Sequence, residues 1–224
     1  MAQIFFSHSK KDEQQNDFFR KVFSTTRVKG VIEEFEQIDK IINSEKIKQD
    51  ISLSSAIFVS LGPNTDNILH TRDWILWESG AAANRGIWVF EPIQYLGKIN
   101  VAIPHLSHYV IYDTTDPWMK YIRNIVNSYD DYPILFLTLL GSALGALAGG
   151  NLEGMAIGAI GVPILFLTNR TRPSGKKIKC SNCSSIYEVH IPSGLNFYRC
   201  PICNASWKIE LGILPTQGFH FSTG

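Results

Sequence analysis

Five short apolar runs alternate with four amphipathic stretches over residues 1–131, and this alternation restricts the fold more than any other feature of the chain. Such alternation is typical of βα units that build a mostly parallel sheet. The expected strands are residues 3–6, 31–35, 56–60, 87–90 and 108–112. The expected helices are residues 12–23, 44–53, 71–84 and 117–128. We therefore expect an α/β domain with a doubly wound, flavodoxin-like parallel sheet, whose ligand site lies beyond the carboxyl ends of the strands.

The next segment differs sharply, because residues 133–168 contain a single charged residue, Glu153. Two apolar stretches, 133–149 and 152–168, are each 17 residues long, which is the short limit for a membrane-spanning helix. Both carry glycines four residues apart, a spacing that lets helices approach closely in lipid: Gly141, Gly145 and Gly149, then Gly154 and Gly158. The pattern predicts a transmembrane helical hairpin over residues 132–169. A buried hairpin within a soluble oligomer is the alternative.

The charges around this hairpin predict its orientation. Five basic residues and no acidic residue lie in the segment 170–179, and basic flanks favour the cytoplasmic side. Both soluble parts of the chain are therefore expected in the cytoplasm, and the first residues lack the basic start of a secretory signal peptide. The net charge of +1 gives no electrostatic reason to expect nucleic acid as the main partner.

All four cysteines lie near the end of the chain, as two CxxC pairs separated by 16 residues: Cys180, Cys183, Cys200 and Cys203. This spacing predicts a four-cysteine zinc ribbon over residues 176–212. A closed set of four thiolates leaves no open position on the metal, so the zinc would be structural. The ribbon's basic and aromatic residues permit contact with nucleic acid, although the same composition is what a small ribbon needs to cover its metal.

The candidate reactive group is Glu78, which follows Trp74 by four residues, so that both lie on one face of the expected helix 71–84. An aromatic plane beside a carboxylate suits a cationic heteroaromatic ligand. The alternative is that Trp74 and Trp77 are ordinary core residues and that Glu78 is a solvated or capping acid.

The order of motifs along residues 1–130 resembles that of TIR domains. The run 4–12 resembles their first strand and loop, in which Ser7 and His8 follow the apolar residues. Residues 31–35, 47–55 and 56–64 resemble the second strand, the next helix and the third strand with its polar loop. The Trp-x-x-x-Glu of 74–78 falls where the family has this motif. Two departures are the short first helix and the loop 36–43, which lacks the Pro-Gly that many relatives carry.

The resemblance implies an enzyme that cleaves NAD+ into nicotinamide and ADP-ribose or a cyclic ADP-ribose, in defence or cell-death signalling. Glu78 would be the catalytic carboxylate, and Trp74, Ser7 and Lys10 would bind substrate. Self-association through the TIR-like domain and the glycine-patterned hairpin would complete or cluster the sites. Two other functions stay open: a non-enzymatic TIR scaffold that acts by homotypic assembly at a membrane, and an unrelated flavodoxin-like enzyme that acts on nucleosides.

Overall fold

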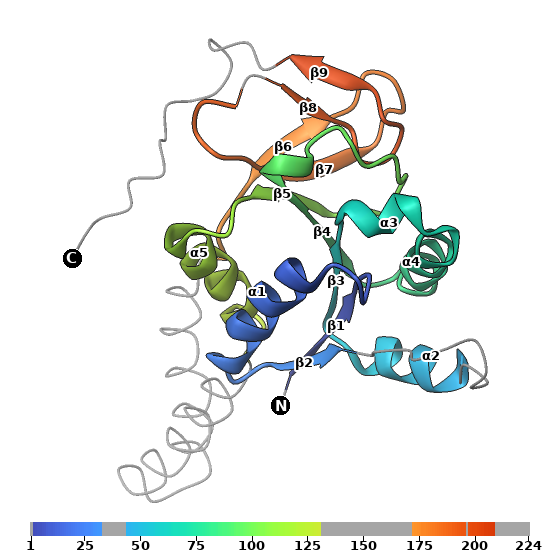
Figure 1. The fold of residues 1–224 in the computed structure, drawn as a ribbon, viewed down its shortest axis with the longest axis vertical. Coiled ribbons are helices and arrows are strands. Elements are labelled where there is room, and N and C mark those ends of the chain that lie inside the picture. Colours follow the sequence, from blue (N-terminus) through green and yellow to red (C-terminus); the bar gives the residue numbers. More distant parts are fainter. Residues whose placement is uncertain (1, 33–43, 131–171, 196, 209–224) are drawn as a thin grey trace, which may run out of the picture.

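The computed structural model describes residues 2–32, 44–130, 172–195 and 197–208. Its main feature is a seven-stranded sheet with the order β2-β1-β3-β4-β5-β7-β6 (Figure 1). Neighbouring strands are parallel except for the antiparallel pair β6 and β7. The strands are β1 (Gln3–Ser7), β2 (Lys29–Ile32), β3 (Ala56–Ser60), β4 (Gly86–Pro92), β5 (His108–Tyr112), β6 (Lys176–Lys179) and β7 (Ile186–His190). A separate antiparallel pair consists of β8 (Phe197–Arg199) and β9 (Ser206–Lys208).

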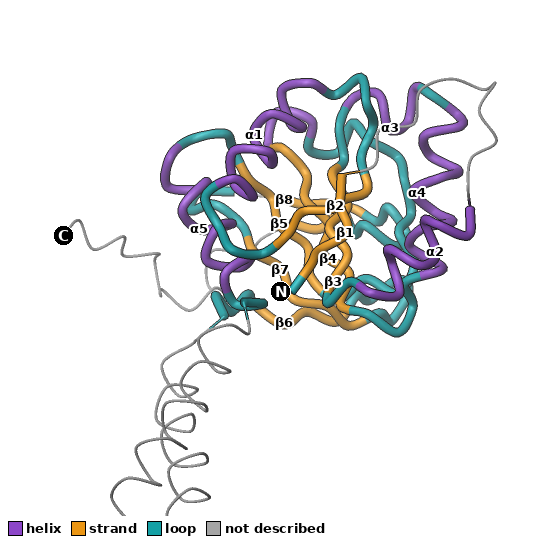
Figure 2. The backbone as a smooth tube through the Cα atoms, turned by 90° about the horizontal axis from the view of Figure 1, so that it is seen from below, coloured by secondary structure: helices purple, strands orange, loops and turns teal. Residues whose placement is uncertain are grey.

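Helices cover both faces of this sheet, which confirms the expected α/β fold with a mostly parallel sheet (Figure 2). One face carries α1 and α5, and the other carries α2, α3 and α4. The helices are α1 (Glu13–Ser24), α2 (Ser44–Leu53), α3 (Pro63–Asn67), α4 (Leu69–Ala81) and α5 (Asp116–Asn127), with a 3-10 turn at η1 (Ile93–Tyr95). The short helix α3 was not expected, because five residues are too few to show a helical period.

The packing explains why the local sequence forms these elements. In α5 five large apolar or aromatic residues recur at helical spacing and are buried: Trp118, Tyr121, Ile122, Ile125 and Val126. Strand β3 is buried at every position, which is typical of a central strand in a sheet covered on both faces. Successive residues of β4 alternate between the two cores: Trp88 and Phe90 pack on the α1 and α5 side, whereas Ile87 and Val89 face the opposite core.

The cysteine-containing segment continues the main sheet. Strand β7 lies parallel to β5, in register from His108 opposite Glu188 to Val110 opposite His190. The second CxxC loop also contacts the parallel-sheet region, because the amide of Ile103 donates to the carbonyl of Pro201 at 2.9 Å. The sequence predicted the cysteine site but gave no sign that its strands would join the sheet.

The predicted membrane hairpin, residues 132–169, lies outside the described residues. Among the helices that the structure does describe, none combines the length and the apolar character needed to cross a bilayer.

Candidate functional site

Glu78 and Ser7 meet at the carboxyl end of β1, although 71 residues separate them in the sequence. Ser7 is the last residue of β1, and Glu78 lies on α4. The hydroxyl of Ser7 donates to Oε2 of Glu78 at 2.5 Å, and the two residues are only 2% and 6% exposed. The sheet therefore brings two of the predicted site residues together at the edge where ligand sites of parallel sheets are usually found.

Burial changes the acidity of this carboxyl group. Loss of solvation raises the pKa of Glu78 from its ordinary 4.5 to about 7, and the hydrogen bond from Ser7 opposes that rise. Near neutral pH the group can therefore exchange between its acid and carboxylate forms. A side chain in this state can donate or accept a proton, or can stabilise positive charge that develops beside it.

The loops after β1 and β3 are joined by Asp12. Its Oδ1 accepts hydrogen bonds from the amide of Asn64 at 3.1 Å and from Nδ2 of Asn64 at 2.7 Å. Asp12 is only 4% exposed, and burial raises its pKa while the bonds from Asn64 lower it. This carboxyl group fixes the start of α3 against the loop that follows Ser7. The sequence gave no signal for this connection.

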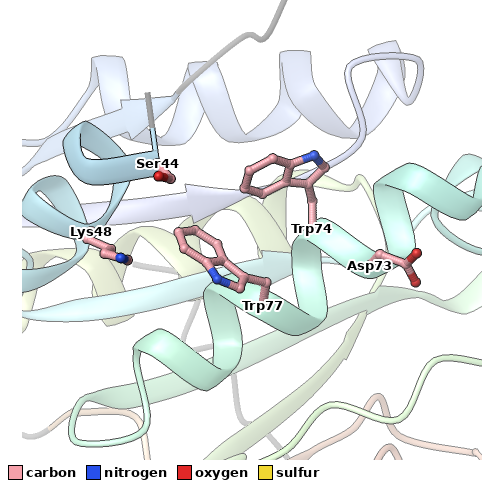
Figure 3. Close-up of a pocket in the computed structure, with 5 residues that line it drawn as sticks. All are labelled: Ser44, Lys48, Asp73, Trp74 and Trp77. Carbon is pink, nitrogen blue, oxygen red and sulfur yellow. The ribbon is translucent and has the colours of Figure 1, made fainter. Parts of the chain in front are cut away.

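A pocket of about 360 Å³ lies between α2 and α4, within the usual size range of small-molecule sites. Trp74 and Trp77 form one side of it, edge to face, with ring centroids 5.2 Å apart (Figure 3). The described lining residues are Ser44, Lys48, Asp73, Trp74 and Trp77. Trp74 thus lines a pocket, as predicted for a binding residue. Lys48 and Ser44 were missed, because nothing in the sequence indicated that α2 would lie beside α4.

The predicted site residues do not all converge. Glu78 is not among the described residues that line the tryptophan pocket; it faces Ser7 instead. Lys10 is exposed on the loop after β1 and does not belong to the described lining either. The structure therefore shows a buried carboxyl group and an aromatic pocket on the same helix, as two neighbouring features.

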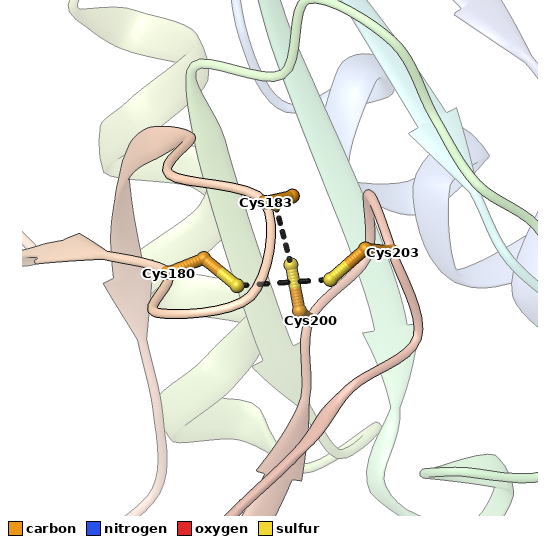
Figure 4. A group of neighbouring side chains, drawn as sticks. All are labelled: Cys180, Cys183, Cys200 and Cys203. Carbon is orange, nitrogen blue, oxygen red and sulfur yellow. Dashed lines mark hydrogen bonds between the residues drawn. The ribbon is translucent and has the colours of Figure 1, made fainter.

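The four cysteines come together as the spacing predicted (Figure 4). Their sulfur atoms lie 3.6 Å apart for Cys180 and Cys203, and 3.9 Å apart for Cys183 and Cys200. Thiolates around one tetrahedral zinc, with bonds of about 2.3 Å, lie roughly 3.8 Å from one another. All four cysteines are free of disulfides, so the group is suited to hold a metal such as zinc.

The two CxxC loops have the same backbone geometry, which explains how they present their thiolates. Ser184 and Asn204 each donate an amide hydrogen bond at 2.8 Å to the carbonyl of the cysteine four residues earlier. Both residues adopt the same left-handed conformation, with φ of 59°. Asparagine tolerates this conformation better than most residues. Two equivalent turns therefore place two sulfurs each around a common centre.

Comparison with protein-family models, with curated proteins and with solved structures finds no match to this chain.

Proposed function

We propose that the chain is a TIR-type NAD+ glycohydrolase that releases nicotinamide and forms ADP-ribose or a cyclic ADP-ribose, with Glu78 as its catalytic carboxylate. The observation that carries the proposal is the buried contact between Ser7 and Glu78 at the carboxyl end of β1. The ordered motifs of residues 1–130 and the tryptophan pocket on the same helix support it.

The chemistry fits one buried carboxylate. Nicotinamide leaves NAD+ as a neutral molecule and takes the electron pair of the glycosidic bond, so departure needs little acid assistance. The barrier lies mainly in the positive charge that develops on the ribose, as in glycoside hydrolysis. Ionised Glu78 would stabilise this oxocarbenium-like charge. Ser7 would hold the carboxylate, and a water molecule or an atom of the adenine ring would then attack the ribose carbon.

The tryptophan pocket, the cysteine group and the apolar hairpin would contribute to substrate binding, to folding and to location. The indoles of Trp74 and Trp77 offer apolar faces to a nicotinamide or adenine ring, and Lys48 offers a positive charge to a phosphate at the same pocket. The four cysteines would hold a structural zinc ion. The hairpin 132–169 would anchor the protein in a membrane with both soluble parts in the cytoplasm, and the glycine pattern would favour self-association.

The first test compares nicotinamide release by the detergent-solubilised full chain and by its Glu78→Gln variant. The amide keeps the size of the side chain but removes the charge. We expect NAD+ turnover to fall by at least 100-fold, about 3 kcal/mol of transition-state stabilisation. Nicotinamide and ADP-ribose are quantified by liquid chromatography.

The matched control is Glu13→Gln, which makes the same chemical change at an exposed acid on α1. Its turnover should equal that of the wild type, and circular dichroism should show both variants folded. A folded Glu78→Gln protein with wild-type turnover would refute the assignment. Base release from deoxynucleosides without NAD+ cleavage would favour a nucleoside enzyme, and inactivity on both substrates would favour the scaffold.

A further inference from the structure

A second group of ligand-type side chains lies at the opposite end of the sheet from Glu78. His108 is the first residue of β5, and the strand register places it opposite Glu188 of β7, with His190 two residues further along. Residues two apart on a strand point to the same face. All three side chains therefore project from the face that α1 and α5 cover, near the amino end of β5, whereas Ser7 ends β1 at the carboxyl end.

The distances within this group are unusual for hydrogen bonds. Nδ1 of His108 lies 3.4 Å from Oε2 of Glu188, and Nε2 of His190 lies 3.4 Å from the same Nδ1. Well-formed hydrogen bonds to nitrogen are about 2.7–3.2 Å long. Ligand atoms around tetrahedral zinc, with bonds of about 2.0–2.1 Å, lie roughly 3.3–3.5 Å apart. The ligand atoms of all three residues lie within 4.8 Å of one another.

The surroundings hold both imidazoles in place. The hydroxyl of Tyr121 lies 2.6 Å from Nδ1 of His190, so this contact occupies one ring nitrogen and leaves Nε2 directed at the other ligands. Metal-binding histidines usually have such a partner on the second nitrogen. The ring of His108 stacks on Trp88, with centroids 3.7 Å apart and planes inclined by 9°.

Gly175 leaves room beside Nε2 of His190. A Cβ at this position would lie 2.7 Å from Nε2 of His190, closer than non-bonded atoms can approach. The amide of Gly175 also donates to Oε2 of Glu188 at 3.3 Å, which orients the carboxylate. Any larger residue here would fill the space around the imidazole.

The charges around these three side chains affect how well they can hold a cation. His190 is buried and His108 is largely covered, and a histidine binds a metal as the neutral ring. Glu188 supplies one negative charge. Among the residues that the structure describes, nearby positive charges are Arg172, which lies over the ring of Tyr129 at 4.6 Å, and Lys177, opposite Glu188 on β6. Zinc is the divalent ion best matched to two imidazoles and one carboxylate at tetrahedral spacing.

We propose that His108, Glu188 and His190 form a second zinc site, which joins β5 to β7 and leaves one coordination position open. Three protein ligands leave the fourth position for water or an exogenous oxygen or nitrogen ligand. Glu188 provides the access, since its side chain is 36% exposed, whereas that of His108 is 12% exposed. The site is separate from the four-cysteine group and does not depend on NAD+ cleavage.

The test measures how many zinc ions the full chain binds. The protein is stripped of metal with a chelator and refilled with Zn2+, and the zinc bound per chain is then measured by inductively coupled plasma mass spectrometry. The wild type should hold two zinc ions per chain and Glu188→Gln one, with affinity for the second ion at least 100-fold weaker. Glu13→Gln, the exposed control, should keep both. One zinc in the wild type, or two equally tight ions in a folded Glu188→Gln protein, overturns the proposal.

X-ray absorption at the zinc edge makes the result independent of any variant. With both sites filled, the average zinc shell of the wild type should contain sulfur and light ligands in about equal number, because one ion has four sulfurs and the other has nitrogen and oxygen ligands. A shell of sulfur alone would refute the second site. Gly175→Ala should weaken the light-atom component and leave the sulfur component unchanged.

Discussion

At the scale of a residue, Glu78 should make folding depend on pH. Its pKa of about 7 in the folded protein exceeds the ordinary value of 4.5, so the folded state holds a proton that the unfolded state has released between these values. The stability contributed by this proton is fully present below pH 4.5 and is lost as pH rises through 7. Glutamine cannot ionise. Glu78→Gln should therefore exceed the wild type in free energy of unfolding by about 2–3 kcal/mol at pH 8.5, with little difference at pH 4.5.

Urea denaturation at the two pH values measures this change. Glu91, whose pKa burial also raises to about 7, contributes in the same direction, so only the difference between variant and wild type isolates Glu78. Glu13→Gln, at an exposed position, should show no pH-dependent difference. An equal effect of Glu78→Gln at both pH values would show that its charge is not buried as described.

At the scale of an element, α3 depends on the fit between Gly62 and Asp12. A Cβ on Gly62 would lie 2.1 Å from Oδ2 of Asp12, so Gly62→Ala must rotate the carboxyl group away from both hydrogen bonds with Asn64. The backbone of Gly62, with φ of −129°, accepts alanine without strain, which makes the clash the only local cost. We expect a loss of about 1–3 kcal/mol in the free energy of unfolding.

Gly80→Ala on α4 is the control, because nothing lies within 4 Å of a Cβ at that position. It should be neutral or stabilise the protein by up to about 1 kcal/mol, since alanine favours helix. Thermal unfolding of the two variants and of the wild type measures both changes in stability. Equal stability of Gly62→Ala and wild type would mean that the Asp12 carboxyl group can move without cost.

At the scale of the whole molecule, the cysteine site should stabilise the entire sheet. Strand β7 begins three residues after Cys183 and pairs with β5. Loss of the proposed zinc ion should therefore loosen an edge of the main sheet as well as the CxxC loops. We expect Cys183→Ser, Cys200→Ser to lower the melting temperature of the helical circular dichroism signal by roughly 5–10 °C, since structural zinc contributes several kcal/mol to folding.

The helical signal is informative because every described helix lies between residues 13 and 127, outside the cysteine segment. A double Cys→Ser variant that loses zinc but keeps the wild-type melting temperature of its helices would show that the segment folds independently of the sheet. Gly80→Ala again serves as the matched control, and it should retain its zinc.

The local sequence pattern was sufficient to predict many of the secondary-structure elements of this protein. The alternation of apolar runs predicted the five parallel strands of residues 1–131, although β2 begins two residues before its predicted start. Helix α2 has the predicted bounds, because strand and helix periods are properties of neighbouring residues. The two CxxC pairs predicted the cysteine cluster for a similar reason: each tight turn fixes its own two sulfurs. The position of Glu78 on a helix came from the same kind of local information.

Tertiary structure decided the contacts on which the proposed function and the proposed second metal site depend. Ser7 reaches Glu78 across 71 residues and His190 reaches His108 across 82, and no local period encodes either pairing. Strand order decides both, since β1 must lie beside β3 and β7 beside β5 before these side chains can meet. The raised pKa of Glu78 follows from its burial. The sequence by itself thus determined which residues are available for chemistry, whereas packing determined their neighbours and their charge, because solvation and distance exist only in the folded chain.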